Sequence, residues 1–516
     1  MKKEVNYSKY SQEELIKFLL EKEKEYDKLE AKFYELQKKY DALLKEKLIL
    51  EEKNKLSVRR LFGKKSESKS KEVNVINEAE KTAQKKDTKS AGRKKGSTNF
   101  SKVFLENNYE ETITIEPDEY EQLKDNKDVI FIDEDISYKA FYEPGRYKIV
   151  RYVRKKYLDK KTGKFYQKDT SNDPFPHSIC TSSLATNIMV NKFMYGLPYY
   201  RQAEVMLNNG IGFSRQDLCN YQIKSTDRLK TLYNFLKKKL INTSSKVINA
   251  DETTLKVIET KKDKCYVWVY CTTFYDNPIY LYEYCKSRSK ENVVSFLSDY
   301  KGYLLTDCYS GYSNLENIEN AYCWAHARRN FYEIVETLSD ELIKESFANK
   351  MVHLIDKLFV VEAKFKELKY GPNKIKEERN KDRYLSLVEN VFTSLKSVQP
   401  EKGTKLERSI NYMLERENGF KTFLKDGHIE ISNNISERAI KPFVIDRKNF
   451  LFSNTENGAR SSMIFFSLLQ TARANMVDPI KYISNVIDTI GDEPNENLLE
   501  SLLPWNYAKD HPEVKL

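Results

Sequence analysis

The sequence of 516 residues contains few cysteines, and they are scattered. Its seven cysteines form no C-x-x-C pair, and none precedes Cys180. An odd, scattered set argues against a disulfide framework and indicates a reducing, cytoplasmic environment. The sequence also lacks any run approaching 18 apolar residues, and its first residues lead into a charged helical segment. We therefore expect neither export nor a membrane span.

The composition argues against a disordered chain. Hydrophobic residues make up 40% of the sequence and aromatic residues 12%, enough to bury a sizeable core. A chain of this length is too long for a single core, so we expect several modules.

The net charge of +11 is concentrated in two segments. Residues 57–100 carry 13 Lys and Arg against 5 Asp and Glu, and residues 141–168 carry 10 against 2. Basic segments on an otherwise nearly neutral chain indicate a polyanionic partner. The second segment interleaves aromatic residues with its cations, which suits stacking and phosphate contact. A solvated basic hairpin would explain one such segment equally well, but two together favour nucleic acid.

Apolar residues recur in steps of four and three from Leu15 to Leu50. This 3.5-residue repeat predicts a coiled coil over residues 1–60, with Lys22 and Lys47 as polar breaks. A helix packed on its own protein is the alternative. Self-association is favoured because no proline or glycine interrupts the segment.

The next two segments differ in composition. Residues 61–100 are rich in Lys and Ser and predict a basic flexible linker, in which Arg93, Lys94 and Lys95 could enter a DNA minor groove. Residues 101–178 show short apolar runs and a Pro-Gly turn, which predict a small β-rich domain.

Residues 179–245 carry a helical pattern. Three helices are predicted, over 184–195, 200–207 and 215–223. A glycine-containing turn precedes the third helix, and Ser214 can cap it. This order is typical of a helix-turn-helix, whose third helix would present Arg215, Gln216 and Asn220 to DNA. Any small helical bundle would show similar turns and helix caps.

From residue 247 the pattern becomes that of an α/β domain. Strands are predicted over 247–258, 266–273, 279–284, 303–306 and 321–325, with a helix over 290–300. A three-stranded meander, a crossover helix and two further strands is the order of a ribonuclease-H-like sheet. In that topology Asp251 on the first strand and Asp307 after the fourth would be neighbours. Asp307 could instead be an ordinary turn residue without a catalytic role. That alternative does not apply to Asp251, because it lies in the middle of a predicted strand.

A third carboxylate, Glu437, falls in a predicted helix after a long helical insertion at 331–424. An ion pair with Lys441 is the plain alternative for it, and Pro442 is expected to kink or end the helix. Carboxylates from two strands and a helix are what a site needs to bind two divalent metals for phosphoryl transfer. The catalytic core is therefore expected in two parts, 246–330 and 425–485, followed by a tail over 486–516.

Several motifs are shared, in order, with one family. They are L-F-G-K-K-S-E at 61–67, K-F-M-Y-G-L-P-Y-Y-R-Q at 192–202, A-D-E-T at 250–253, T-D-C-Y-S-G-Y at 306–312, C-W-A-H-A-R-R-N-F at 323–331, N-N-I-S-E-R-A-I-K-P at 433–442, R-K-N-F-L-F at 447–452 and L-P-W-N at 503–506. In these the chain resembles the transposases of the insertion-sequence-66 group (TnpC-type), over almost its whole length.

The resemblance implies a DDE recombinase. Asp251, Asp307 and Glu437 would bind two Mg²⁺ ions, for which Mn²⁺ could substitute, and the protein would cleave and join DNA. Guanidinium groups suit phosphate, so we expect contacts with the DNA backbone from Arg328, Arg329 and Arg438.

The resemblance also implies partners. These are double-stranded DNA at the element's ends and at the target, a second copy of the chain through the coiled coil, and accessory proteins of the same element. A nuclease of the same fold and a non-catalytic DNA-binding protein derived from a transposase are the alternatives.

The sequence departs from the family pattern in two places. The family usually carries a zinc ribbon before the helix-turn-helix, whereas residues 101–178 contain no cysteine. Ser432 stands where an Asp often precedes the Asn pair. Cys323 and His326 form a C-x-x-H pair, but since no second pair accompanies it we expect no zinc and instead a structural or DNA-contacting role at the edge of the sheet.

Overall fold

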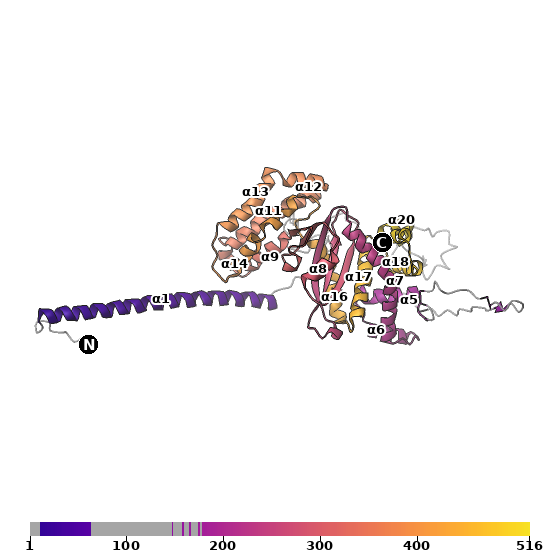
Figure 1. Ribbon diagram of the computed structural model, residues 1–516, viewed down its shortest axis with the longest axis horizontal. Helices are drawn as coiled ribbons and strands as arrows, with labels where there is room; N and C mark the ends of the chain where they lie inside the picture. The colour runs from indigo at the N-terminus through magenta and orange to yellow at the C-terminus, as the bar shows by residue number, and fades with distance from the viewer. Residues whose placement is uncertain (1–10, 63–146, 148–156, 159–164, 167–173, 176–177) are drawn as a thin grey trace, which may run out of the picture. The chain divides into compact units, whose positions relative to one another are not determined.

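The computed structural model describes residues 11–62, 147, 157–158, 165–166, 174–175 and 178–516 (Figure 1). The predicted linker, with Arg93, Lys94 and Lys95, lies outside the described residues, as does most of the predicted β-rich segment. Two short strands of that segment are described, β1 (Tyr157–Leu158) and β2 (Phe165–Tyr166), and they pair antiparallel.

The first described element is one long helix, α1 (Gln12–Phe62). Many apolar residues of the predicted repeat, such as Leu29, Leu36 and Leu43, are exposed along it. The helix itself is confirmed, and its pairing with a second copy stays a prediction. None of the described helices is both long and apolar enough to cross a membrane.

A five-stranded mixed sheet follows, with its strands in the order β5–β4–β3–β6–β7. β4 pairs antiparallel with β3 and β5, whereas β6 pairs parallel with β3 and β7. The bounds are Val247–Leu255 (β3), Cys265–Thr272 (β4), Tyr280–Cys285 (β5), Gly302–Thr306 (β6) and Ile318–Tyr322 (β7). The parallel pairing of β3 with β6 requires the crossover, which contains helix α8 (Lys290–Phe296).

The five predicted strands are present, but the last is shifted. A strand is expected over 321–325, whereas β7 ends at Tyr322 and helix α9 (Trp324–Val335) begins after Cys323. Trp324, Ala327 and Phe331 are buried at helical spacing, so the apolar run belongs to the helix. A short apolar run alone does not distinguish the two structures.

Both faces of the sheet are covered, because the central strands carry apolar side chains on both of their faces. Tyr270 of β4 stacks on Phe296 of α8, with ring centroids 3.9 Å apart. On the other face, the Tyr282 hydroxyl donates to the Ala439 carbonyl of helix α16 (Asn434–Phe450). Asp251 alternates with Ala250, which is paired with Tyr270, and therefore lies on the α16 face.

Three helices precede the sheet: α5 (Ser182–Phe193), α6 (Tyr199–Asn208) and α7 (Arg215–Ile241). The third is expected to end at residue 223 but continues to Ile241. Apolar residues at helical spacing extend its buried stripe, and α17 (Glu456–Ala474) packs along it and against β5 (Figure 1).

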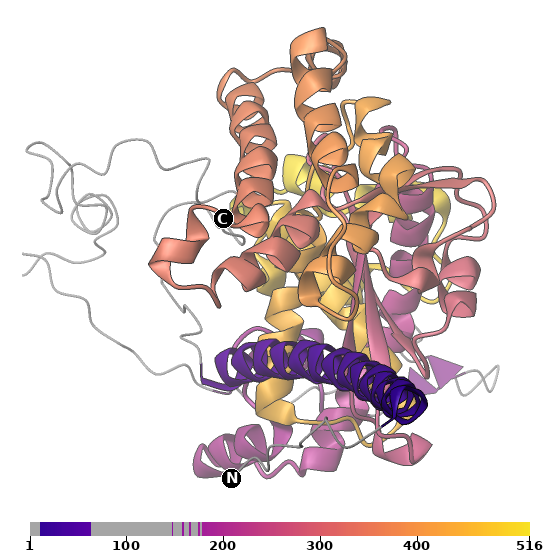
Figure 2. The ribbon, with the colours of Figure 1, turned by 90° about the vertical axis from the view of Figure 1, so that its left-hand side faces the viewer.

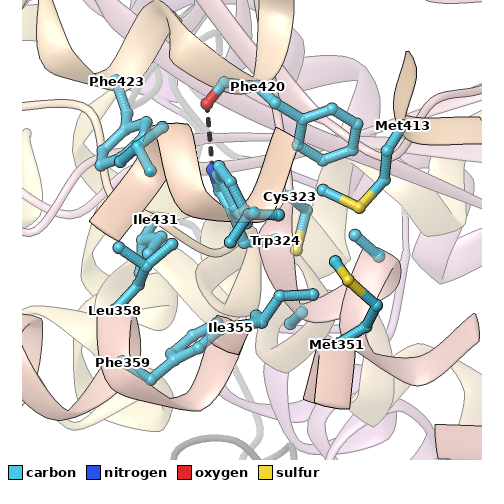
Figure 3. Close-up of a cluster of buried hydrophobic side chains, with 14 of the residues drawn as sticks. Cys323, Trp324, Met351, Ile355, Leu358, Phe359, Met413, Phe420, Phe423 and Ile431 are labelled. Carbon is cyan, nitrogen blue, oxygen red and sulfur yellow. Dashed lines mark hydrogen bonds between the residues drawn. The ribbon is translucent and has the colours of Figure 1, made fainter. Parts of the chain in front are cut away.

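The stretch after β7 is helical, and its helices form one cluster (Figure 2). They are α9, α10 (Asp340–Ile343), α11 (Phe347–Glu367), α12 (Pro372–Arg379), α13 (Asp382–Lys396), α14 (Lys405–Leu414) and α15 (Glu417–Lys421). Trp324 lies in the core of this cluster and donates its indole N–H to the Phe420 carbonyl, 3.0 Å away (Figure 3). The core of the insertion is therefore continuous with the sheet, since Val247, Leu305 and Ala321 belong to the same buried cluster.

Helix α16 is expected to kink or end at Pro442, but it continues through that residue to Phe450. The remaining helices are α18 (Pro479–Thr489), α19 (Glu496–Ser501) and α20 (Pro504–Asp510). The short 3-10 helices are η2 (Ile258–Thr260), η3 (Ser310–Tyr312), η4 (Thr422–Leu424) and η5 (Pro512–Val514). The architecture is therefore mixed α/β, mostly helical, around one small mixed sheet.

Candidate active site

Asp251 and Asp307 are brought together by the pairing of β3 with β6. Asn249 lies opposite Leu305 in this parallel pair. Each aspartate is two residues further along its strand direction, so both project from the same face at the same end of the pair. This is the neighbourhood that the predicted strand order requires.

Each aspartate has one oxygen bound by a backbone amide. The Glu252 N–H donates to Asp251 Oδ1 at 2.8 Å, and the Tyr309 N–H donates to Asp307 Oδ1 at 2.9 Å. Burial, together with the negative charges of Glu252, Asp307 and Glu437, raises the pKa of Asp251 to about 8. The carboxylates at the end of β3 therefore disfavour one another's ionised forms, which a bound cation would stabilise.

Glu437 lies in the first turn of α16, and the start of that helix is bound to β3. The Asn433 side chain donates to the Ala250 carbonyl at 2.8 Å, and the Asn433 N–H donates to Cys323 Sγ at 3.2 Å. Ser432, at the position where the sequence departs from the family pattern, is buried. Through Asn433 the helix that carries Glu437 is held beside the strand that carries Asp251.

The nearest charged neighbours of Glu437 come from α9. His326 Nε2 lies 3.6 Å from Glu437 Oε1, and Arg329 Nη2 lies 3.9 Å from Oε2. Burial lowers the pKa of His326, but Cys323 and Glu437 raise it by more, to about 9. The sequence predicts Arg329 as a DNA contact, and for His326 it predicts a structural or DNA-contacting role at the edge of the sheet.

A second carboxylate beside Asp251 has a different environment. Glu252 lies on the opposite face of β3 and accepts hydrogen bonds from Arg288 Nε at 2.8 Å and from the Tyr312 hydroxyl. Arg288 also stacks over Tyr309, 3.7 Å from its ring centroid. The alternation of side chains along the strand could have indicated that Glu252 is buried. Its partners could not be predicted, because they lie in segments that no sequence pattern connects with Glu252.

Two kinds of metal ligand meet at this site. Asp251, Asp307 and Glu437 offer carboxylate oxygens, the ligands that Mg²⁺ prefers. Within the described part of the chain, the ligand atoms of Cys323, His326 and Glu437 form the one set of three lying within 4.8 Å of one another. The carboxylate oxygens of Asp251, Asp307 and Glu437 do not form such a set among the described residues.

The predicted DNA-contacting residues of α7 are on its surface. Arg215, Gln216 and Asn220 are exposed near its start, and Gln216 donates to Asn220 Oδ1 at 3.1 Å. Ser214 and Asp217 form a capping box there. Their side chains are accessible, and their contact with DNA stays a prediction.

The prediction that Arg328 contacts DNA is wrong. Its guanidinium is buried and pairs with Asp356 of α11, at 2.5 Å from Nε and 3.1 Å from Nη2. The helical period explains this difference, because Arg328 lies on the inner face of α9 while Arg329 lies outside, 47% exposed. Arg438 is half-buried on α16.

The fold and these residues define a class of protein. It is an α/β protein with two aspartates at the end of a pair of parallel strands and a glutamate on a helix that follows a helical insertion. Two family models match the chain, the Transposase IS66 family over residues 177–461 and the IS66 C-terminal element over residues 467–505. The chain belongs to the IS66 family of transposases.

Similar proteins are known from Sinorhizobium fredii (strain NBRC 101917 / NGR234). Uncharacterized protein y4qI is 28% identical over 404 residues, which cover 74% of this chain and 72% of that protein. Uncharacterized protein y4hP is 25% identical over 401 residues, covering 73% and 71%. Both similarities span most of the chain.

Proposed function

We propose that this protein is a DNA transposase that binds the ends of an insertion sequence and catalyses strand cleavage and strand transfer with Asp251, Asp307 and Glu437. The observation that carries the proposal is the register of β3 and β6, which puts two aspartates side by side in a chain of this family. The order β5–β4–β3–β6–β7 supports a ribonuclease-H-like core.

The residues present fit a pair of divalent ions. Asp251 and Asp307 each have one oxygen bound by a backbone amide and one left as a ligand. Burial and then like charges raise the pKa of Asp251, and bound cations would offset both effects. Two Mg²⁺ ions, or Mn²⁺ in their place, would supply an activated oxygen nucleophile and stabilise the leaving oxygen.

The chain's own side chains would position the DNA. Arg329 is exposed beside Glu437 and could pair with a backbone phosphate, as a guanidinium does well. Asn433 fixes the start of α16 on β3, and so sets the place of Glu437 relative to Asp251. No covalent intermediate with the enzyme is required, because a water or a terminal 3′-hydroxyl is the nucleophile.

The remaining parts of the proposal concern partners. Arg215, Gln216 and Asn220 on α7, together with Arg93, Lys94, Lys95 and Arg438, would bind the element's ends. Helix α1 would pair two subunits so that both ends are held in one complex, with accessory proteins of the same element. The site of action would be the bacterial nucleoid.

The test uses linear double-stranded DNA that carries the element's ends. We expect Mg²⁺-dependent cleavage and joining, both reduced by more than about a hundredfold in Asp307→Asn, since a lost ligand removes metal-assisted catalysis. Asp299→Asn is the matched control, because Asp299 is an exposed aspartate. Cleavage without joining would indicate a nuclease, and binding without cleavage would indicate a non-catalytic DNA-binding protein.

A further inference from the structure

The side chains of Cys323, His326 and Glu437, here called the Cys-His-Glu group, converge from two helices that are far apart in the sequence. Cys323 is the N-cap residue of α9, His326 lies in its first turn, and Glu437 lies in the first turn of α16. One thiol, one imidazole and one carboxylate oxygen from these residues all lie within 4.8 Å of one another.

The separation of His326 from Glu437 is that of two metal ligands more than of a hydrogen bond. His326 Nε2 and Glu437 Oε1 are 3.6 Å apart, beyond hydrogen-bond length. Zinc bonds of about 2.0–2.3 Å in a tetrahedral site put two ligand atoms roughly 3.5 Å apart. The separation of these two atoms therefore matches two ligands of one ion.

Polar atoms of the group are buried without a hydrogen-bond partner. Glu437 Oε1, the oxygen that lies 3.6 Å from His326 Nε2, has this property, and so does His326 Nδ1, the other nitrogen of the ring; the two side chains are only 14% and 26% exposed. Cys323 is fully buried, and its sulfur accepts the Asn433 N–H. Buried polar atoms in a folded protein normally have partners, so the unpartnered Glu437 Oε1 beside the imidazole points to a missing ligand.

The donor set selects the kind of ion. A thiolate and an imidazole are ligands for Zn²⁺, whereas Mg²⁺ prefers oxygen alone. A single C-x-x-H pair predicts no zinc from the sequence, but the third ligand comes from a distant helix. Three protein ligands leave a fourth position open, as in many zinc sites that also bind water.

We propose that Cys323, His326 and Glu437 bind one Zn²⁺ ion that joins the start of α9 to the start of α16. These are the two points where the chain enters and leaves the helical insertion, so the ion would fix the base of the insertion against the sheet. Glu437 can bind this ion with Oε1 and still offer Oε2 to the site formed with Asp251 and Asp307, here called the carboxylate site. The inference goes beyond the proposed transposition reaction and does not depend on it.

The first experiment measures metal binding by the purified full-length chain, without DNA. After removal of bound metal with a chelator, the protein is titrated with Co²⁺, a spectroscopic substitute for Zn²⁺. We expect a thiolate-to-cobalt charge-transfer absorption that saturates at one ion per chain and disappears when Zn²⁺ is added. The absence of this absorption in the unmodified chain would overturn the proposal, and this result needs no variant.

Variants then assign the ligands. Cys323→Ser should abolish the charge-transfer absorption, and His326→Gln should weaken cobalt binding by more than about tenfold. Cys265→Ser is the matched control, because Cys265 is also fully buried but lies outside the group, and it should leave the absorption unchanged. An unchanged absorption in Cys323→Ser would contradict the assignment, with circular dichroism confirming that each variant is folded.

One more variant separates this site from the carboxylate site. Asp251→Asn should lose Mg²⁺-dependent DNA cleavage but keep the cobalt absorption. Loss of the absorption in folded Asp251→Asn would mean that the ion belongs to the carboxylate site, and would overturn a separate zinc site. Failure of DNA cleavage in the unmodified chain would instead contradict the proposed function and leave the cobalt result standing.

Discussion

Adjacent residues on β3 have opposite environments, and this is the main point at the scale of single residues. Asp251 faces α16 and lies among other carboxylates, whereas Glu252 faces α8 and has its own cationic partner, Arg288. The Tyr312 hydroxyl, in the loop after Asp307, donates to Glu252 as well. Glu252 therefore connects β3 with the loop that follows the second aspartate.

The first prediction concerns this connection. Glu252→Ala should lower the free energy of unfolding by about 2–3 kcal/mol, because it leaves the buried Tyr312 hydroxyl and the Arg288 guanidinium without their partner. Glu252→Gln keeps an acceptor for Tyr312 and should cost about half as much. Urea unfolding followed by tryptophan fluorescence measures both. Glu291→Ala, at an exposed position, is the control, and equal losses in all three variants would contradict the role of Glu252.

The second prediction is a pH dependence. Burial raises the pKa of Glu283 on β5 from 4.5 to about 7, although Lys237 and Arg460 act in the opposite direction. The folded chain therefore holds a proton that the unfolded chain releases, so this contribution to stability is complete below pH 4.5 and is lost as pH rises through 7. Glu283→Gln removes the ionisable group.

The variant should consequently gain stability relative to the unmodified chain as pH rises from 5 to 8, by about 1–2 kcal/mol. Unfolding midpoints of the two proteins across that range provide the measurement. A difference in stability that is independent of pH would contradict the shifted pKa of Glu283.

At the scale of elements, the insertion is fastened to the segment that leads to α16. Arg379 of α12 pairs with both oxygens of Glu362 on α11, at 2.9 and 2.8 Å. Its Nη1 donates to the carbonyls of Phe423 and Ile429, at 2.8 and 2.9 Å. One buried guanidinium thus joins two insertion helices to the chain that returns toward Glu437.

The third prediction follows from that burial. Arg379→Met should lower the free energy of unfolding by about 3–5 kcal/mol, because Glu362 is left buried without its cationic partner. The double variant with Glu362→Met should be less destabilised than the sum of the two single variants. A double-mutant cycle by chemical denaturation measures this coupling, and additive losses would show that the pair acts independently.

The elements also show what the sequence could predict. Strands β3 to β6 follow from apolar runs bounded by turn residues, and the proximity of Asp251 to Asp307 follows from their order. The start of α9 could not be located from the sequence, because the apolar residues 321–325 suit a strand and a helix equally well. The proximity of His326 to Glu437 could not be predicted either. The two residues lie on either side of the insertion, and a pattern in the nearby sequence cannot indicate so distant a contact.

At the scale of the whole molecule, α1 exposes an apolar seam. We expect the full-length chain to be dimeric or larger, and the double variant Leu36→Asp with Leu43→Asp to be monomeric, since charges at seam positions oppose coiled-coil pairing. Lys32→Asp, off the seam, is the control. Analytical ultracentrifugation decides, and a double variant that keeps the original mass would contradict pairing through α1.

The helical insertion also has a consequence for the order in which the protein is made. Asp251 and Asp307 precede it in the chain, and Glu437 follows it. At about 5–20 residues per second, a ribosome needs on the order of ten seconds to pass from the second aspartate to the glutamate. During that interval the nascent sheet can pair β3 with β6 while its third carboxylate does not yet exist. The proposed site of three carboxylates is therefore completed only after the insertion has been synthesised.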